Sequence, residues 1–185
     1  MPQALETKLD GVVLVQPDVH GDERGFFVET FSADIWKDLG VTADFVQHNH
    51  SRSAKNTLRG LHFQTAPGQA KLVRAPRGRI FDVAVDLRRG SPTYGQWEGH
   101  VLDDETHRQL YVPVGFGHGF CVLSETADVT YLVSSPYDPD TEAGIKWNDE
   151  TVGVEWPVDE PLLSGRDQTA PALADIADDL PFDYG

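Results

Sequence analysis

The chain has 185 residues, enough for one domain with a sizeable core, and its 39% hydrophobic and 24% charged residues are ordinary for a globular protein. Thirty acidic residues against 15 basic ones give a net charge of −15, which excludes the broad basic surfaces that bind nucleic acid or anionic membranes. No signal peptide or membrane-spanning run is evident, and the single cysteine, Cys121, rules out an internal disulfide. These features predict one domain over residues 1–185, a cytoplasmic location, and neither nucleic acid nor a membrane as partner.

Short apolar runs separated by scattered glycines and prolines make up most of the chain, a pattern typical of many short strands joined by turns. The strands expected, in chain order, are 26–31, 58–64, 71–75, 78–88, 109–114, 119–124 and 128–135. Segment 33–40 (ADIWKDLG) has the pattern of a short helix that ends at Gly40, and segment 172–180 (ALADIADDL) that of a second one. The sequence therefore predicts a mainly β protein with few helices.

Segment 78–88 (GRIFDVAVDLR) has the clearest strand pattern, because its residues alternate with a period of two. One face is wholly apolar and consists of Phe81, Val83, Val85 and Leu87. The other face mixes small, apolar and acidic side chains, namely Ile80, Asp82, Ala84 and Asp86. We expect an all-β fold, an antiparallel β-sandwich or jelly roll with short peripheral helices, in which a cavity can lie between the sheets.

Segment 58–64 (LRGLHFQ) places a titratable ring in a strand that is otherwise built for a core. By alternation, His62 and Gln64 share one face, and this polar pair favours a lined cavity over a dry core. A buried histidine bonded to a carbonyl is the alternative for His62 considered alone. Arg59 falls on the opposite face, so we expect a bend, or a neighbouring subunit, if it is to serve the same cavity as His62.

Segment 113–120 (PVGFGHGF) has the proline, glycine and histidine spacing of the second cupin motif, which makes the predicted jelly roll cupin-like. Metal-binding cupins carry histidines and a glutamate in their first motif, where this chain has Gln64 and Gln69. Neutral amides are weaker ligands for a transition metal than imidazole or carboxylate, and the nearby Lys71 would oppose a metal charge. We expect no metal and no cofactor. A metal-dependent oxygenase or isomerase remains the alternative.

Several spaced motifs occur in one order along nearly the whole chain. They are DERGFFVETF (22–31), QHNHSRS (47–53), LRGLHFQ (58–64), residues 69–97, YVPVGFGHGF (111–120), TEAGIKWND (141–149) and LSGRD (163–167). With these motifs the chain resembles the dTDP-4-dehydrorhamnose 3,5-epimerases. The resemblance implies a homodimeric cupin-like jelly roll that epimerises C3 and C5 of dTDP-4-dehydro-6-deoxy-D-glucose, without a cofactor, to give dTDP-4-dehydro-L-rhamnose for dTDP-rhamnose biosynthesis.

The resemblance also implies a role for each matching residue. His62 is implied as the general base, Tyr131 as the general acid, Asp167 as the partner of the imidazole, and Lys71 as the cation beside the sugar carbonyl. Tyr137 is implied to stack on the thymine ring. The remaining positions implied to contact the nucleotide-sugar are Arg24, Glu29, Gln47, Asn49, Arg59, His118, Glu142 and Arg166.

Elementary chemistry supports these residue types, because the ketone of a 4-keto sugar acidifies the protons at C3 and C5. Epimerisation needs a base on one face, an acid on the other, and a positive group for the enolate oxygen. The alternatives are an enzyme that epimerises only C3 or only C5, a ketoisomerase, and a catalytically silent sugar-binding module. The joint presence of His62, Tyr131 and Asp167 argues against silence, while the sequence does not separate double from single epimerisation.

Overall fold

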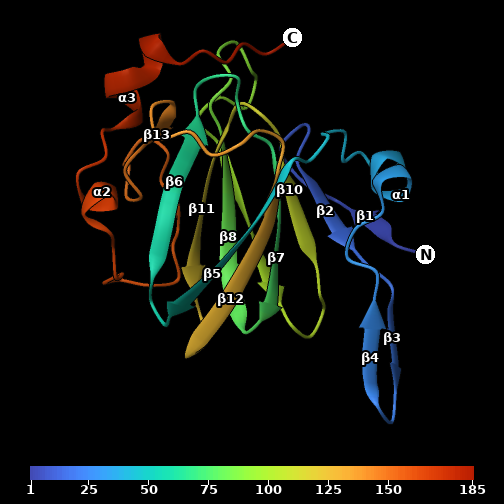
Figure 1. Ribbon diagram of the computed structural model, residues 1–185. Coiled ribbons are helices and arrows are strands. Elements are labelled where there is room, and N and C mark those ends of the chain that lie inside the picture. The colour runs from blue at the N-terminus through green and yellow to red at the C-terminus, as the bar shows by residue number, and fades with distance from the viewer.

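Two antiparallel sheets packed face to face form the body of the protein in the computed structural model, which describes residues 1–185 (Figure 1). The six-stranded sheet has the order β1 (Gln3–Leu5), β2 (Val13–Gln16), β10 (Gln109–Val112), β7 (Lys71–Arg77), β12 (Thr126–Val133) and β5 (Gln47–Ala54). The five-stranded sheet has the order β13 (Glu142–Gly144), β6 (Leu58–Gln64), β11 (Phe116–Val122), β8 (Arg79–Asp86) and β9 (Trp97–Asp103). The predicted all-β, cupin-like sandwich is confirmed.

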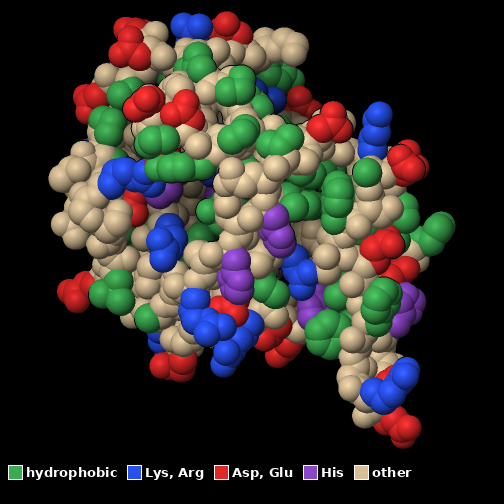
Figure 2. Space-filling model, in the orientation of Figure 1, with side chains coloured by type: hydrophobic (Ala, Val, Ile, Leu, Met, Phe, Trp, Pro, Cys, Tyr) green, Lys and Arg blue, Asp and Glu red, His purple; other side chains and the backbone are tan.

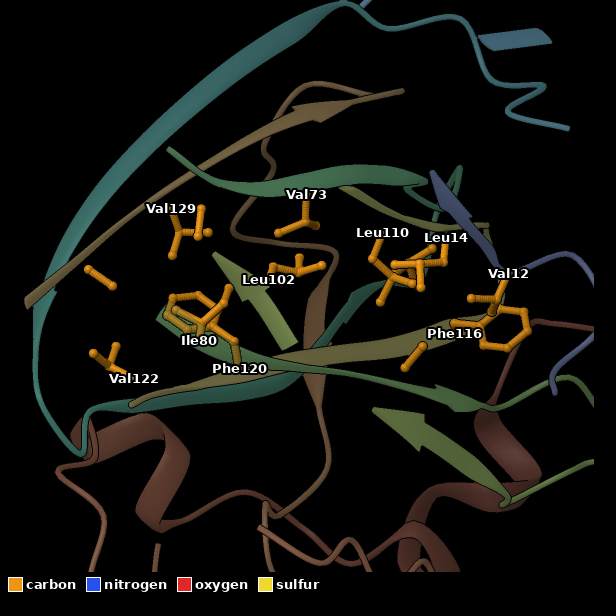
Figure 3. Packing of buried hydrophobic residues seen from close by; sticks show 14 of the residues in the cluster. Val12, Leu14, Val73, Ile80, Leu102, Leu110, Phe116, Phe120, Val122 and Val129 are labelled. Atoms are coloured by element: carbon orange, nitrogen blue, oxygen red, sulfur yellow. The ribbon is translucent and has the colours of Figure 1, made fainter. Parts of the chain in front are cut away.

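The main core lies between the two sheets and is built from the inward side chains of both. Figure 3 shows Val73 and Leu110 of the six-stranded sheet pointing toward Ile80 and Phe120 of the five-stranded sheet. Ile80, Val73 and Leu110 have no solvent exposure. Because burial of each such side chain contributes roughly 1.5–3 kcal/mol, this cluster holds the sheets at a fixed separation.

Strand β8 is buried on both faces, which explains why one face is wholly apolar and the other mixed. Ile80 and Ala84 point into the core between the sheets. Val83 and Val85 point outward, where the C-terminal part of the chain covers them with Leu173 and other apolar side chains. The outer face of the five-stranded sheet is therefore closed by the C-terminal segment, and one end of the space between the sheets remains available for a cavity.

The helices are short and peripheral, as expected. Helix α1 (Ala33–Asp38) buries Trp36 against the outer face of the six-stranded sheet and ends before Gly40, whose φ is +100°. The C-terminal segment contains α2 (Gly165–Gln168), α3 (Leu173–Ile176) and the 3₁₀ turn η1 (Ala177–Asp179). None of these helices has the length and apolar character that crossing a membrane requires.

The prediction of a strand over 26–31 is only partly right. Strand β4 ends at Val28 and pairs only with β3 (Val19–Asp22), so that Gly25–Val28 belongs to a separate two-stranded hairpin. The hairpin projects from the body at the lower right of Figure 1. Phe26 and Phe27 are 60% and 69% exposed, so the apolar run that suggested a core strand contributes little to the core of this chain.

Candidate active site

A polar cavity of about 190 Å³ opens between the two sheets. The six-stranded sheet contributes Asn49, Ser51, Lys71 and Tyr131 to its lining. The five-stranded sheet contributes Arg59, His62, His118, Phe120 and Glu142. Two loops and α2 complete the lining with Gln69, Tyr137 and Arg166. Few of these side chains are apolar, so the cavity suits a charged, hydroxylated ligand.

An irregularity in β6 brings Arg59 and His62 to the same cavity. His62 pairs with His118 of β11 and Arg59 pairs with Phe120, so Gly60 and the next residue oppose Gly119 alone. This extra residue is a β-bulge, which turns Arg59 to the inner face despite its position in the alternation. A Cβ atom at Gly60 would come within 2.5 Å of the Gly119 Cα atom, so the close approach of the two strands requires glycine. The expected bend is confirmed.

His62 forms a buried pair with Asp167. Its Nε2 lies 2.5 Å from Asp167 Oδ1, and Ser164 Oγ donates to the other carboxylate oxygen at 2.8 Å. Burial acts to raise the pKa of Asp167, but the hydrogen bonds from His62 and Ser164 outweigh it, and the pKa lies below its ordinary value. The ionised carboxylate therefore fixes the proton on Nε2, and Nδ1 is the ring nitrogen that keeps a lone pair.

Burial also keeps His62 in its basic form. Desolvation lowers the pKa of the ring below its ordinary value, the Asp167 carboxylate opposes this, and the nearby Arg166 guanidinium adds to it. Arg166 Nη2 lies 3.0 Å from His62 Nε2 and 3.3 Å from Nδ1, so the guanidinium stands directly beside the ring. At neutral pH the site thus holds a neutral imidazole oriented by a carboxylate.

Lys71 and Tyr131 approach the cavity from the opposite sheet. Lys71 is only 9% exposed, and its Nζ donates to the His62 carbonyl oxygen at 3.4 Å, across the gap between β7 and β6. Burial lowers the pKa of Lys71 to about 8, and the Asp82 carboxylate is the strongest opposing influence. Burial raises the pKa of Tyr131, so its hydroxyl is protonated at neutral pH. A cation, Lys71, and a proton donor, Tyr131, therefore face the pair formed by His62 and Asp167.

The mouth of the cavity is built around Glu142. Its carboxylate accepts hydrogen bonds from the Tyr137 hydroxyl at 2.9 Å and from Arg166. The Tyr137 backbone amide donates to Gln47 Oε1 at 3.2 Å, and Gln47 in turn donates to Asn49 Oδ1 at 2.8 Å. Tyr137 is 55% exposed, so its ring is available as a flat surface at the entrance.

The two glutamines at the cupin ligand positions bond to each other and to a loop. Gln69 Nε2 donates to Gln64 Oε1 at 2.7 Å, and Gln64 Nε2 donates to the Asp138 carbonyl at 2.9 Å. No group of three or more His, Cys, Asp or Glu side chains is arranged to hold a metal ion. The amides thus have a structural role in holding the loop that carries Tyr137. Metal independence stays a prediction.

Comparisons with known proteins agree with this geometry. The family model described as dTDP-4-dehydrorhamnose 3,5-epimerase matches residues 6–175. The chain belongs to the dTDP-4-dehydrorhamnose 3,5-epimerase family. A curated 3,5-epimerase of this name from Pseudomonas aeruginosa is 49% identical over 94% of this chain and 97% of its own. A dTDP-4-dehydrorhamnose 3-epimerase from Streptomyces niveus is 45% identical over 92% of this chain and 83% of its own.

The solved structures include a closely similar epimerase with a nucleotide-sugar. The dTDP-6-deoxy-D-glucose-3,5-epimerase from Legionella pneumophila, in complex with dTDP-4-keto-L-rhamnose, has a TM-score of 0.96 and 44% identity to this chain. The match covers all of both chains. The family assignment and the predicted fold are therefore shown by sequence and by structure.

Most residues that the family resemblance implied lie together. Those that line the cavity are His62, Tyr131, Lys71, Asn49, Arg59, His118, Tyr137, Glu142 and Arg166. Asp167 and Gln47 lie behind this lining and bond to His62 and Asn49, respectively. His48 and His50 are exposed and alternate with the cavity-facing residues of β5, so they are solvated side chains outside the site. Figure 2 shows histidine and basic side chains gathered over β5 and β12.

The structure does not bring Arg24 and Glu29 to the cavity of their own chain. Arg24 is exposed at the tip of the β3–β4 hairpin, where it pairs with Asp22. Glu29 is exposed just after β4, and neither residue belongs to the cavity lining. The cavity of a single chain therefore lacks the two nucleotide-sugar contacts that the family resemblance implies for Arg24 and Glu29.

Sequence reasoning missed three polar residues of the site. Ser51 lines the cavity with a buried hydroxyl that has no partner, and Ser53 accepts hydrogen bonds from Arg59 at 3.1 Å. Both follow Asn49 at intervals of two on β5, so the alternation of that strand was a usable signal. Asp82, fully buried beneath His118, was visible as an acidic residue on the mixed face of segment 78–88, but it was not connected with the site.

Proposed function

We propose that this epimerase-family protein inverts C3 and C5 of dTDP-4-dehydro-6-deoxy-D-glucose and releases dTDP-4-dehydro-L-rhamnose, with no metal or cofactor. The observation that carries the proposal is the opposition of His62 and Tyr131 across one cavity. His62 belongs to β6 of the five-stranded sheet, whereas Tyr131 belongs to β12 of the six-stranded sheet. A sugar ring between the sheets has one residue on each face, which is the requirement for inversion of a carbon centre.

Each proton transfer then has a donor, an acceptor and a charge to stabilise it. His62 Nδ1 removes the proton from the carbon next to the ketone, and the Asp167 carboxylate stabilises the imidazolium that forms. The Lys71 ammonium stabilises the negative charge that develops on the C4 oxygen. Tyr131 delivers a proton to the carbon from the opposite face. Solvent then takes the proton from the His62 imidazolium and returns one to the Tyr131 oxygen, and the same sequence at the second carbon completes the double inversion.

The nucleotide part of the substrate requires cations and an aromatic surface. Arg59 lines the cavity, and its bonds to Ser53 engage Nε and Nη2, which leaves Nη1 free for a phosphate oxygen. Tyr137 offers its exposed ring to the thymine, and the bond from its hydroxyl to Glu142 sets the orientation of the ring. Arg59 and Tyr137 thus hold opposite parts of the dTDP group.

We further propose that two copies of the chain form a homodimer in which each β3–β4 hairpin lies against the partner. Support comes from the exposed rings of Phe26 and Phe27 on a projecting hairpin, since adjacent large apolar side chains exposed to solvent mark an interaction surface. The dimer would also allow Arg24 and Glu29 to serve the cavity of the partner. Sedimentation equilibrium should give twice the chain mass, and a single-chain mass would contradict the dimer.

We also infer a cytoplasmic location and a small-molecule substrate rather than nucleic acid or a membrane. Cys121 is buried, and desolvation raises the pKa of its thiol to about 11, so it is suited to a structural role in a reducing compartment. The net charge of −15 opposes binding of polyanions.

The function is tested by incubation with dTDP-4-dehydro-6-deoxy-D-glucose in heavy water with excess chelator, followed by NMR. We expect inversion and one solvent deuteron at C3 and at C5. Deuterium and inversion at C3 alone would instead identify a single-site epimerase, and movement of the carbonyl would identify a ketoisomerase. Activity that disappears on chelation and returns with one divalent metal would support the metal-dependent alternative. Binding without any turnover would indicate a sugar-binding module.

Replacing Arg59 with alanine should weaken binding of thymidine diphosphate by about 1.5–3 kcal/mol, the range for hydrogen bonds to charged groups, or roughly 10- to 100-fold in Kd. Isothermal titration calorimetry measures the change directly. Arg79→Ala is the matched control, because Arg79 is exposed at the start of β8 and is not part of the cavity lining. Unchanged affinity in Arg59→Ala would refute the assignment.

A further inference from the structure

The Asp82 carboxylate lies behind His118, below the cavity, and takes no part in the proton transfers described above. It belongs to the inner face of β8 and has no solvent exposure. Its Oδ1 accepts a hydrogen bond from His118 Nε2 at 2.9 Å, whereas its Oδ2 is buried without a hydrogen-bond partner. Asp82 is not itself part of the cavity lining, so any effect on a substrate passes through the residues above it.

A buried carboxylate with one unsatisfied oxygen is costly unless a nearby charge compensates for it. Lys71 is the cation available, since it is almost fully buried and makes a single, long hydrogen bond to the His62 carbonyl. Asp82 is the strongest charge that acts to keep the pKa of Lys71 high. The two residues therefore compensate each other across the gap between β7 and β8.

We propose that Asp82 is a positioning residue of this site: it holds the His118 imidazole through one oxygen and supplies the negative charge that keeps the Lys71 ammonium protonated beside the substrate. This inference rests on the proposed function, because it gives the ammonium its task at the C4 oxygen. His118 donates through Nε2, so Asp82 fixes the orientation of a ring that lines the cavity. Asp82 would act on the reaction only through these two side chains.

Other ionisable groups around Lys71 also change its pKa. Glu142 of β13 raises the pKa of Lys71, and Arg166 of α2 lowers it. The remaining titratable side chains of the cavity lining are Arg59 and His62 on β6, His118 on β11, Tyr131 on β12 and Tyr137 on the adjoining loop. Without Asp82, burial and Arg166 would dominate, and a large fraction of Lys71 would be neutral at neutral pH.

The variant Asp82→Asn separates charge from shape, because its amide oxygen can still accept the hydrogen bond from His118. The titration of Lys71 is followed by competitive acetylation, in which trace acetic anhydride labels neutral amines at each pH and mass spectrometry resolves the five lysines. We expect the Lys71 pKa to be near 8 in the wild-type protein and about one unit lower in Asp82→Asn. The alkaline fall in kcat/KM should move to lower pH by the same amount.

Asp86→Asn is the matched control. Asp86 is another fully buried carboxylate on the same face of β8, but it is bonded to Arg88, Ser91 and Thr93. Its replacement should lower thermal stability and leave the Lys71 titration unchanged. Asp82→Glu, which retains the charge, should restore the wild-type titration, and Asp82→Ser provides a second neutral variant if Asp82→Asn does not fold.

An unchanged Lys71 pKa in the neutral variants would overturn the proposal and leave Asp82 as a structural residue only. Because acetylation needs no substrate, this result is independent of the epimerase assay. A wild-type protein that fails to epimerise the keto sugar would refute the proposed function, while the labelling experiment would still decide whether Asp82 controls the charge of Lys71.

Discussion

The His62→Ala variant is expected to lose epimerisation by about 10²–10⁴-fold, the usual contribution of a positioned general base. The loss follows because the variant removes the imidazole that Asp167 orients on the five-stranded side of the cavity, opposite Tyr131, and puts no proton acceptor in its place. The rate is measured by NMR detection of inverted product. Binding of thymidine diphosphate should be nearly unchanged, since Arg59 and Tyr137 remain in place.

His50→Ala is the control for this variant, because the His50 side chain is 56% exposed and lies on the opposite face of β5 from the cavity. The wild-type pH profile provides a second check. Since burial lowers the pKa of His62, the base is available at neutral pH, and kcat/KM should fall only as the pH drops through that lowered pKa. A His62→Ala enzyme with the wild-type rate would show that this ring is only structural.

The Tyr131→Phe variant is expected to lose about 10²-fold or more of the inverted product while keeping the ability to remove a proton. The ring that packs against the core is retained, and only the hydroxyl on the six-stranded side of the cavity is removed. Deprotonation by His62 can continue, but the proton then returns from the face that it left. Chromatographic separation of the epimers measures the loss. Full inversion by this variant would require another donor on that side.

The fold could be predicted because strand signals are local. The alternation in segment 78–88 depends only on which face each residue presents, and the structure confirms a strand there with both faces buried. The same reasoning was wrong about residues 29–31, which follow the end of β4, and Phe26 and Phe27 of β4 are apolar but exposed. An apolar run indicates that a surface will be covered, and it does not specify whether its own chain covers it.

The site was less accessible to reasoning from the residues alone. Arg59 joins His62 only because of the bulge at Gly60, and a two-residue alternation cannot reveal a bulge without the paired strand. Asp167 lies more than 100 residues from His62 in the sequence, and only the family resemblance connected them. Asp82 and Ser51 had a usable signal, since each is a polar residue on the inner face of a strand.

The most direct measurement of two-sided proton transfer compares deuterium uptake with inversion in heavy water. Mass spectrometry of the unconverted substrate and of the product gives both quantities for the wild-type, His62→Ala and Tyr131→Phe proteins. We expect deuterated, inverted product from the wild type, deuterated but uninverted substrate from Tyr131→Phe, and no deuterium from His62→Ala. Deuterium uptake by His62→Ala at the wild-type rate would contradict the assignment of His62 as the base.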